Sequence, residues 1–117
     1  MALCVKRVYE DPDEADGERV LVDRIWPRGL SKEKARLSDW RKELAPSNDL
    51  RKWFGHDPER WEEFKERYRA ELEEAGKMGD LHDIAERAME ENVTLLFGAK
   101  DTKHNNARAL EAFIGEV

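Results

Sequence analysis

The sequence predicts an α/β fold: a single compact, layered domain in which a small, mostly parallel sheet of three to four strands is covered by helices. Short apolar segments at residues 3–9, 20–26 and 93–99 have the composition of strands. Two amphipathic segments precede the last of them and supply the crossover that parallel strands require. With 117 residues the chain suffices for one hydrophobic core, so we expect residues 1–117 to form one domain.

The N-terminal part of the chain is predicted to contain two strands joined by a loop. Residues 3–9 form the first strand, in which Cys4 is expected to be a small buried hydrophobe. The acidic residues 10–19 include proline and glycine and predict a loop or a single helical turn. Residues 20–26 are apolar on both faces, as in a central strand of a covered sheet. Pro27 has no amide hydrogen to donate, so this strand is expected to end there.

The middle of the chain is predicted to form short elements. Ser31 is a suitable N-cap for a helix over residues 32–37. Residues 38–45 are ambiguous, and we favour a third strand or an extended segment. A helix over residues 49–54 is expected to be capped by the serine or asparagine before it and to end at Gly55.

The second half is predicted to hold three longer helices. Asp57 and Pro58 form a clear helix start, and this helix is expected to reach about Ala75. Further helices are expected from about residue 80 to residue 89 and over residues 104–117. The apolar stripes expected to face the core are Trp61, Phe64, Tyr68, Leu72 and Ala75, then Leu81, Ile84, Ala85, Ala88 and Met89, and last Ala107, Leu110, Phe113, Ile114 and Val117.

Composition narrows the function classes. The formal charge of −6 and pI near 5.2 argue against a nucleic-acid-binding protein, which usually presents a net basic face. The single cysteine excludes an internal disulfide and a cysteine-rich zinc site, and the histidines lack zinc-helix spacing, so we expect no metal. Phosphate-binding glycine loops and dinucleotide fingerprints are absent, and we expect no cofactor.

The hydropathy pattern lacks any apolar run of 18 residues, so no membrane span is expected. Lys6 and Arg7 interrupt the first apolar segment, which argues against a signal peptide. The expectation is a soluble cytoplasmic protein. The sequence does not specify an oligomeric state.

Polar residues follow two of the predicted strands. Ligands of open α/β sheets bind outside the carboxyl ends of strands, and the N-terminus of the following helix favours an anion. If the two strands are parallel neighbours, their polar residues line one crevice. We expect Arg24, Arg28, Lys100, Asn105 and Asn106 to bind the ligand. In an enzyme, Asp23, Asp101 or His104 would act as the acid or base.

These residues also allow structural interpretations, which the sequence leaves open. Asp23 and Arg24 would equally suit pairing with groups from the helices, because an unpaired buried charge is costly. Arg28 would equally cap carbonyl groups in its own turn. Asn105 and Asn106 stand where ordinary helix caps occur. His56, between Gly55 and the Asp57 cap, is favoured as a hydrogen bonder at a helix junction rather than as a catalyst.

Long sequence motifs resemble the YeaO-like family of uncharacterised bacterial and archaeal proteins, a domain of unknown function numbered 488. The resemblance covers nearly the whole chain and rests on Lys6-Arg7-Val8-Tyr9, Arg19-Val20-Leu21-Val22-Asp23-Arg24-Ile25-Trp26-Pro27-Arg28-Gly29, Leu50-Arg51-Lys52-Trp53-Phe54-Gly55-His56-Asp57, Trp61-Glu62-Glu63-Phe64 and His104-Asn105-Asn106-Ala107. It implies a single compact α/β domain and favours a strand over residues 38–45. It supplies no reaction, cofactor or partner.

The resemblance also has a negative implication. In the broader group to which the family belongs, a cysteine-histidine-arginine signature follows the last strand. The corresponding positions here are Asn105, Asn106 and Ala107. Thiol chemistry of the kind such a signature would support is therefore not available to this chain.

Three functional hypotheses follow. The first is a domain that binds a small anionic ligand, phosphate-bearing or nucleotide-like, at the carboxyl ends of its strands, either as an enzyme or as a ligand binder. The second is a nucleic-acid-associated module that presents Arg24, Arg28, Arg51 and Lys52 locally. The third is a protein-interaction module without catalysis, for which an exposed apolar patch at Trp26 or Trp53 would be evidence.

Overall fold

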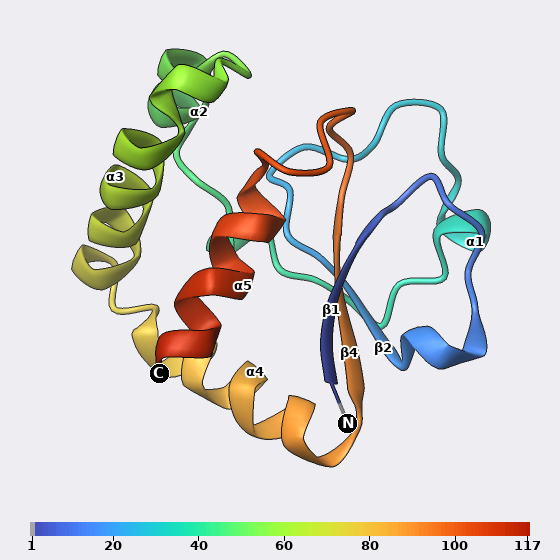
Figure 1. Ribbon diagram of the computed structural model, residues 1–117. Coiled ribbons are helices and arrows are strands. Elements are labelled where there is room, and N and C mark those ends of the chain that lie inside the picture. Colours follow the sequence, from blue (N-terminus) through green and yellow to red (C-terminus); the bar gives the residue numbers. More distant parts are fainter. Residues whose placement is uncertain (1) are drawn as a thin grey trace.

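The computed structural model describes residues 2–117 and contains a four-stranded sheet in the order β1-β4-β2-β3 (Figure 1). Every neighbouring pair of strands is parallel. The strands are β1 (Ala2–Arg7), β2 (Glu18–Leu21), β3 (Asp39–Trp40) and β4 (Asn92–Phe97). β4 therefore lies between β1 and β2, and the prediction of a small parallel sheet covered by helices is confirmed.

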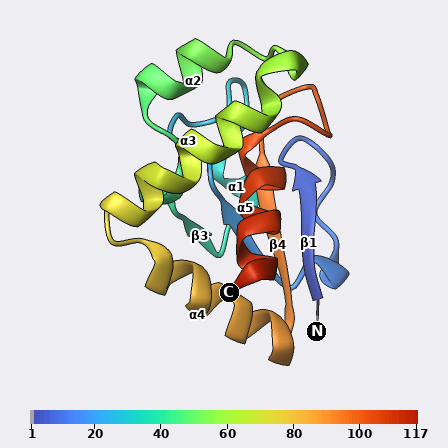
Figure 2. The ribbon, with the colours of Figure 1, turned by 60° about the vertical axis from the view of Figure 1, so that its left-hand side comes forward.

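The long helices gather on one side of this sheet, and the short α1 lies on the other (Figure 1). Turned by 60°, the molecule shows α5 directly over β4 and β1, with α3 and α4 beside it (Figure 2). The helices are α1 (Lys32–Ala35), α2 (Asn48–Phe54), α3 (Trp61–Glu74), α4 (Met78–Glu90) and α5 (Asn106–Glu116), with single 3-10 turns η1 (Glu14–Asp16), η2 (Lys42–Leu44) and η3 (Pro58–Arg60).

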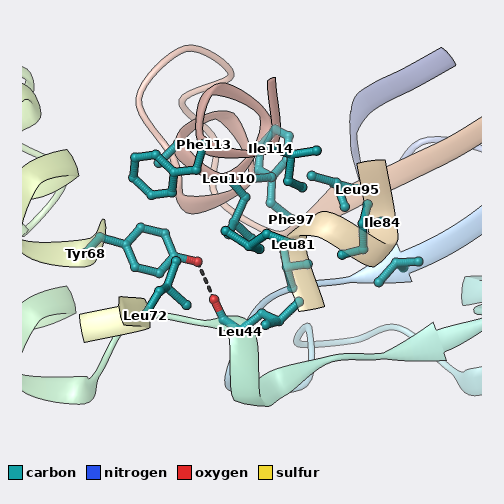
Figure 3. Close-up of a cluster of buried hydrophobic side chains, with 14 of the residues drawn as sticks. Leu44, Tyr68, Leu72, Leu81, Ile84, Leu95, Phe97, Leu110, Phe113 and Ile114 are labelled. Atoms are coloured by element: carbon teal, nitrogen blue, oxygen red, sulfur yellow. Dashed lines mark hydrogen bonds between the residues drawn. The ribbon is translucent and has the colours of Figure 1, made fainter. Parts of the chain in front are cut away.

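The main core lies between the sheet and the long helices. Leu95 of β4 packs with Leu81 of α4 and Leu110 of α5, all fully buried (Figure 3). The buried hydroxyl group of Tyr68 on α3 donates to the carbonyl oxygen of Leu44, as the dashed line in Figure 3 shows. This bond satisfies the polar end of an otherwise apolar residue. Burial raises the pKa of the Tyr68 phenol well above its usual range.

A second, smaller core covers the opposite face of the sheet. Val8, Leu21 and Leu96 are buried there beneath residues of the segment that links β2 to β3 and of β3 itself. Trp26 meets Trp40 edge to face, with 5.3 Å between ring centroids. This face is thus covered by a loop and two indole rings, with α1 as its only short helix among the described residues.

The caps that the sequence predicts are present at the helix starts. The Ser31 hydroxyl accepts from the Lys34 amide, and the Ser47 hydroxyl accepts from the Leu50 amide. Asp57 caps η3, which continues into α3. Residues 38–45 contribute the two-residue strand β3 and then the η2 turn, so the prediction of a strand there holds for only part of the segment.

Two predictions about the strands were wrong. The second strand ends at Leu21 rather than Trp26, because the Gly98 amide donates to the Asp23 side chain and the Val22 carbonyl accepts from Asn106, so the next ladder bond between the strands is not made. Cys4 is exposed. It lies on the edge strand β1, between Leu3 and Val5, which pack against the main core, so its own side chain points to the other face.

Three residues expected in the core are also exposed, and one of them is Ala75, which follows the end of α3. Met89 is 77% exposed and Val117 is 43% exposed. Met89 follows Ala88 by one position, a rotation of about 100° that moves it off the stripe formed by Leu81, Ile84 and Ala88. Val117 lies beyond the last residue of α5.

A buried ion pair ties η1 to β2. The guanidinium of Arg19 donates to the Asp16 carboxylate at 2.5 Å and to the Ala35 carbonyl at the end of α1. Lys6 adds a second cation at 3.1 Å from Asp16. Burial alone would raise the pKa of Asp16, but hydrogen bonds from the Asp13 amide and the two cations lower it below its ordinary value.

Candidate ligand-binding site

A cavity of about 220 Å³ opens where β2 and β4 end. The two strands are parallel neighbours, as the crevice hypothesis required, and in both ribbon views α2 and the loop after β4 lie at this end of the sheet (Figures 1 and 2). Thirteen residues line it: Asp23, Arg24, Ile25, Ala45, Pro46, Arg51, Phe54, His56, Phe64, Ala99, His104, Asn105 and Asn106.

Asp23 lies in the wall of this cavity and joins the ends of the two strands. Its Oδ2 accepts the amide hydrogen of Gly98 at 2.8 Å, and the side-chain amide of Asn106 also hydrogen-bonds to the carboxylate. The same amide nitrogen donates to the Val22 carbonyl at 2.7 Å. Burial raises the pKa of Asp23, although these hydrogen bonds and the charge of Arg51 oppose the rise.

Arg24 is held against the segment before α2. Its Nε donates to the Pro46 carbonyl at 3.1 Å, and Nη2 donates to the Ala45 carbonyl at 3.2 Å. These bonds use two of the five guanidinium hydrogens, so three remain for a ligand or water. Arg24 thus combines a fixed position with spare donors, and Arg51 from α2 contributes a second guanidinium to the same cavity.

His104 is oriented from two sides. Its Nδ1 lies 3.0 Å from Oδ2 of Asp101, and its ring meets Trp61 edge to face at 5.4 Å. A carboxylate at Nδ1 favours the tautomer in which Nε2 is the acceptor. Hydrogen bonds from the Lys103 amide and from His104 lower the pKa of Asp101. Asp101 therefore positions His104 and does not line this cavity itself.

Asn105 acts as the cap of α5. Its Oδ1 accepts from the Arg108 amide at 2.9 Å, and its Nδ2 donates to the Asp101 carbonyl at 2.9 Å. The residue is only 3% exposed. Both polar atoms of the Asn105 side chain are therefore used in capping, as the helix-cap interpretation predicts, although the residue also lines the cavity. The amide that reaches Asp23 belongs to Asn106 instead.

The remaining predicted site residues lie elsewhere. Arg28 does not line the cavity; it is exposed, and its carbonyl accepts from the Tyr9 hydroxyl at 2.8 Å. Lys100 and Asp101 line a second, more open hollow of about 540 Å³. The two hollows share His56 and Ala99, so they adjoin each other. The strands' carboxyl ends thus bring together five of the eight predicted residues.

Several lining residues come from α2 and α3 and were not among the predicted site residues. Arg51 and Phe54 lie on α2, His56 follows it, and Phe64 lies on α3. His56 has a positive φ of 59°, which is uncommon outside glycine. The sequence signal that could have identified this corner is the Gly55-His56 pair, a break between helices with a titratable side chain at its tip.

Neither a metal centre nor a membrane span is found in residues 2–117. No group of three or more His, Cys, Asp or Glu side chains in that range is arranged to hold a metal ion. No helix there is long and apolar enough to cross a bilayer.

Comparison with known proteins places the chain in a family. A family model described as "Inactive DUF488-N3 subclade" matches residues 2–117. The chain belongs to the DUF488 family. This confirms the resemblance to YeaO-like proteins. The name of the matching subclade agrees with the asparagines and alanine that stand where the broader group has its cysteine-histidine-arginine signature.

Individual relatives of this DUF488 domain are uncharacterized. The uncharacterized protein YeaO of Escherichia coli (strain K12) is 43% identical over 113 residues, which is 94% of each chain. An uncharacterized protein of Mycobacterium tuberculosis (strain ATCC 25618 / H37Rv) is 48% identical over 90 residues, 77% of this chain and 76% of that protein. No solved structure matches.

Proposed function

We propose that this DUF488 domain binds a small phosphate-bearing anion in the cavity at the ends of β2 and β4, as a binding module rather than an enzyme. The observation that carries the proposal is the convergence of two guanidinium groups, Arg24 and Arg51, on one cavity. Planar guanidinium groups match phosphate and carboxylate oxygens. The description of the subclade as inactive supports binding over catalysis.

Other features of the cavity favour an anion. His56 and His104 add imidazole groups to the lining, and Asp23 is the one carboxylate among the residues that line it. The eleven-residue helix α5 begins at the cavity, so its N-terminal amides add partial positive charge.

The alternatives have less support. A nucleic-acid module would need an extended basic surface, whereas this chain has a net charge of −6 and its two cavity arginines converge on a small volume. For an interaction module, Trp26 and Trp53 would need to form an open apolar patch. Both rings are instead half-buried: Trp26 packs on Trp40, and Trp53 lies against the guanidinium groups of two α3-region arginines, Arg60 and Arg67.

The test is a titration of the purified protein with inorganic phosphate and with nucleoside monophosphates at low salt, followed by calorimetry. We expect Arg51→Gln to weaken binding at least about tenfold, the effect of losing one charge-assisted contact. Arg87→Gln is the matched control, since it removes the same charge from an exposed site on α4 that does not line the cavity. Absence of binding to every probe, or equal losses in both variants, would contradict the proposal.

A further inference from the structure

We propose that the ligand carries a planar heterocycle with adjacent N–H donors, the pattern of guanine, and that Asp23 is the residue that recognises it. This inference rests on the anion binding proposed above and concerns the part of the same ligand that does not carry the phosphate. It starts from the incomplete hydrogen bonding of the Asp23 carboxylate within residues 2–117.

The Asp23 carboxylate has unused acceptor capacity. A carboxylate offers about four lone-pair sites, and the protein supplies the Gly98 amide and the Asn106 side chain. Asp23 is only partly buried, so water or a ligand can reach this spare capacity. Asp23 lines the cavity, and its remaining lone pairs are available to donors there.

The surroundings specify what kind of donor suits this carboxylate. A cationic ligand group would meet the guanidinium groups of Arg24 and Arg51 in the same cavity and would be repelled. Neutral N–H groups give the carboxylate hydrogen bonds without added positive charge. A pair of adjacent N–H donors would engage both oxygens in the parallel arrangement that carboxylates accept well.

The rest of the lining suits a flat ring. Phe54 and Phe64 stack on each other with centroids 4.3 Å apart and planes 22° apart, and both reach the cavity. Ile25, Ala45 and Pro46 add apolar surface. A nucleobase has apolar faces, which pack on aromatic side chains, and polar edges, which form hydrogen bonds.

The size of the cavity suits the ring of the ligand but not the whole ligand. The volume of about 220 Å³ is below the ~300–1,000 Å³ typical of sites for drug-sized ligands. A heterocycle therefore fits inside, with its charged group toward the exposed arginines, Arg24 and Arg51. The adjoining hollow beyond His56 and Ala99 offers further space for the part of the ligand that links ring and phosphate.

The experiment compares guanosine monophosphate with inosine monophosphate, which lacks the 2-amino group, and with adenosine monophosphate, using the unmodified protein and calorimetry. Guanosine monophosphate should bind at least about tenfold more tightly than either analogue, the size of one lost hydrogen bond to a charged group. In Asp23→Asn the preference for guanosine monophosphate should disappear, because the carboxylate that accepts the two N–H groups is gone.

The possible outcomes separate the two proposals. Equal affinities for the three nucleotides in the unmodified protein, with phosphate still bound, would overturn the guanine assignment and leave anion binding intact. A preference for guanosine monophosphate that survives in Asp23→Asn would overturn the role of Asp23. Failure of phosphate and all nucleotides to bind would overturn both proposals. Should Asp23→Asn not fold, the analogue series in the unmodified protein still decides the ligand class.

Discussion

The backbone amide of Gly98 donates a 2.8 Å hydrogen bond to Oδ2 of Asp23, which links the residue just after β4 to the residue two positions beyond β2. The two residues are separated by 75 positions in sequence. This bond continues the pairing of the two strands beyond the point where their ladder ends, with a side chain in place of a backbone carbonyl. It also fixes the carboxylate in the cavity wall.

Gly98→Ala should disturb this link. A Cβ at position 98 would lie 3.1 Å from Oδ2 of Asp23, so the carboxylate would have to move by a few tenths of an ångström. We expect a loss of about 1 kcal/mol in the free energy of unfolding, as for other small overpacking changes, together with weaker ligand binding. Urea denaturation and calorimetry measure the two effects.

Gly115→Ala provides the matched control. Gly115 lies within α5, and nothing is within 4 Å of the Cβ that alanine would add. Alanine is the better helix former, so this change should stabilise the protein by roughly 0.5–1 kcal/mol. If both variants gain stability, a Cβ at position 98 does not crowd the Asp23 carboxylate, and the prediction is wrong.

Asp16→Asn should remove a pH-dependent part of the stability. The pKa of Asp16 is lowered on folding, so its contribution is fully present above the unfolded value of about 3.9 and is lost as the pH falls through the folded value. Because Arg19 is only 4% exposed, removing its partner should cost about 3 kcal/mol at pH 7. The difference from the unmodified protein should shrink below about pH 4.

Denaturation at a series of pH values tests this, with Asp83→Asn as the control at an exposed position of α4. The control should change the stability by less than about 0.5 kcal/mol at any pH. A stability difference for Asp16→Asn that stays constant from pH 7 down to about pH 2 would contradict the assigned role of its charge.

Tyr68→Phe should be costly despite its small change in volume. It removes the hydroxyl that donates to the Leu44 carbonyl, in a position with no exposure at all. We expect a loss of about 1–3 kcal/mol, the usual effect of leaving a buried acceptor without its donor. Tyr9→Phe removes a hydroxyl from a residue that is 40% exposed and should cost much less, since water replaces it. Equal losses would count against the buried bond.

Asn105→Ala should destabilise α5 by about 1–2 kcal/mol, because the cap to the Arg108 amide is lost. Asn105→Asp retains an acceptor for that amide and should recover part of the stability. Thermal denaturation of the two variants distinguishes a capping role from a purely ligand-binding one. The capping assignment fails if the two variants unfold at the same temperature.

Local rules predicted much of the fold because the residues that determine it are close together in sequence. Ser31, Ser47 and Asp57 cap the elements that follow them, and Gly55 ends α2 in a left-handed conformation. These outcomes depend on hydrogen bonds within a few residues. The crossover rule also predicted parallel strands, but that β2 and β4 are neighbours was an assumption that the structure bears out.

The end of β2 was harder to predict for a different reason. Val22 is fully buried, and its amide still donates to the Leu96 carbonyl at 3.1 Å, so its composition and bonding are those of a strand residue. The strand ends there because the side chains of Asp23 and Asn106 take the bonds that would continue the ladder, and Gly98 and Asn106 lie more than 70 positions away. Hydropathy alone does not carry that information.

The site was predictable only where strand ends define it. Asp23 and Asn106 were predicted from the positions of the strand ends, and both line the cavity. Arg51 and His56 reach the same cavity because α2 and α3 fold back over the strand ends, a tertiary arrangement without a local sequence period. Arg28 lies in the turn beyond Trp26, whose indole donates to the Leu30 carbonyl, and this turn covers the other face of the sheet.

The strand order determines when the sheet can form during synthesis of the chain. β4 pairs with both β1 and β2, yet it is the last strand to be synthesised. Until residue 97 has left the ribosome, β1 has no partner, and β2 has only the two-residue β3. Because β4 and the start of α5 also supply the far wall of the cavity, the sheet and its binding site must arise together, late and cooperatively, and no N-terminal fragment would hold either.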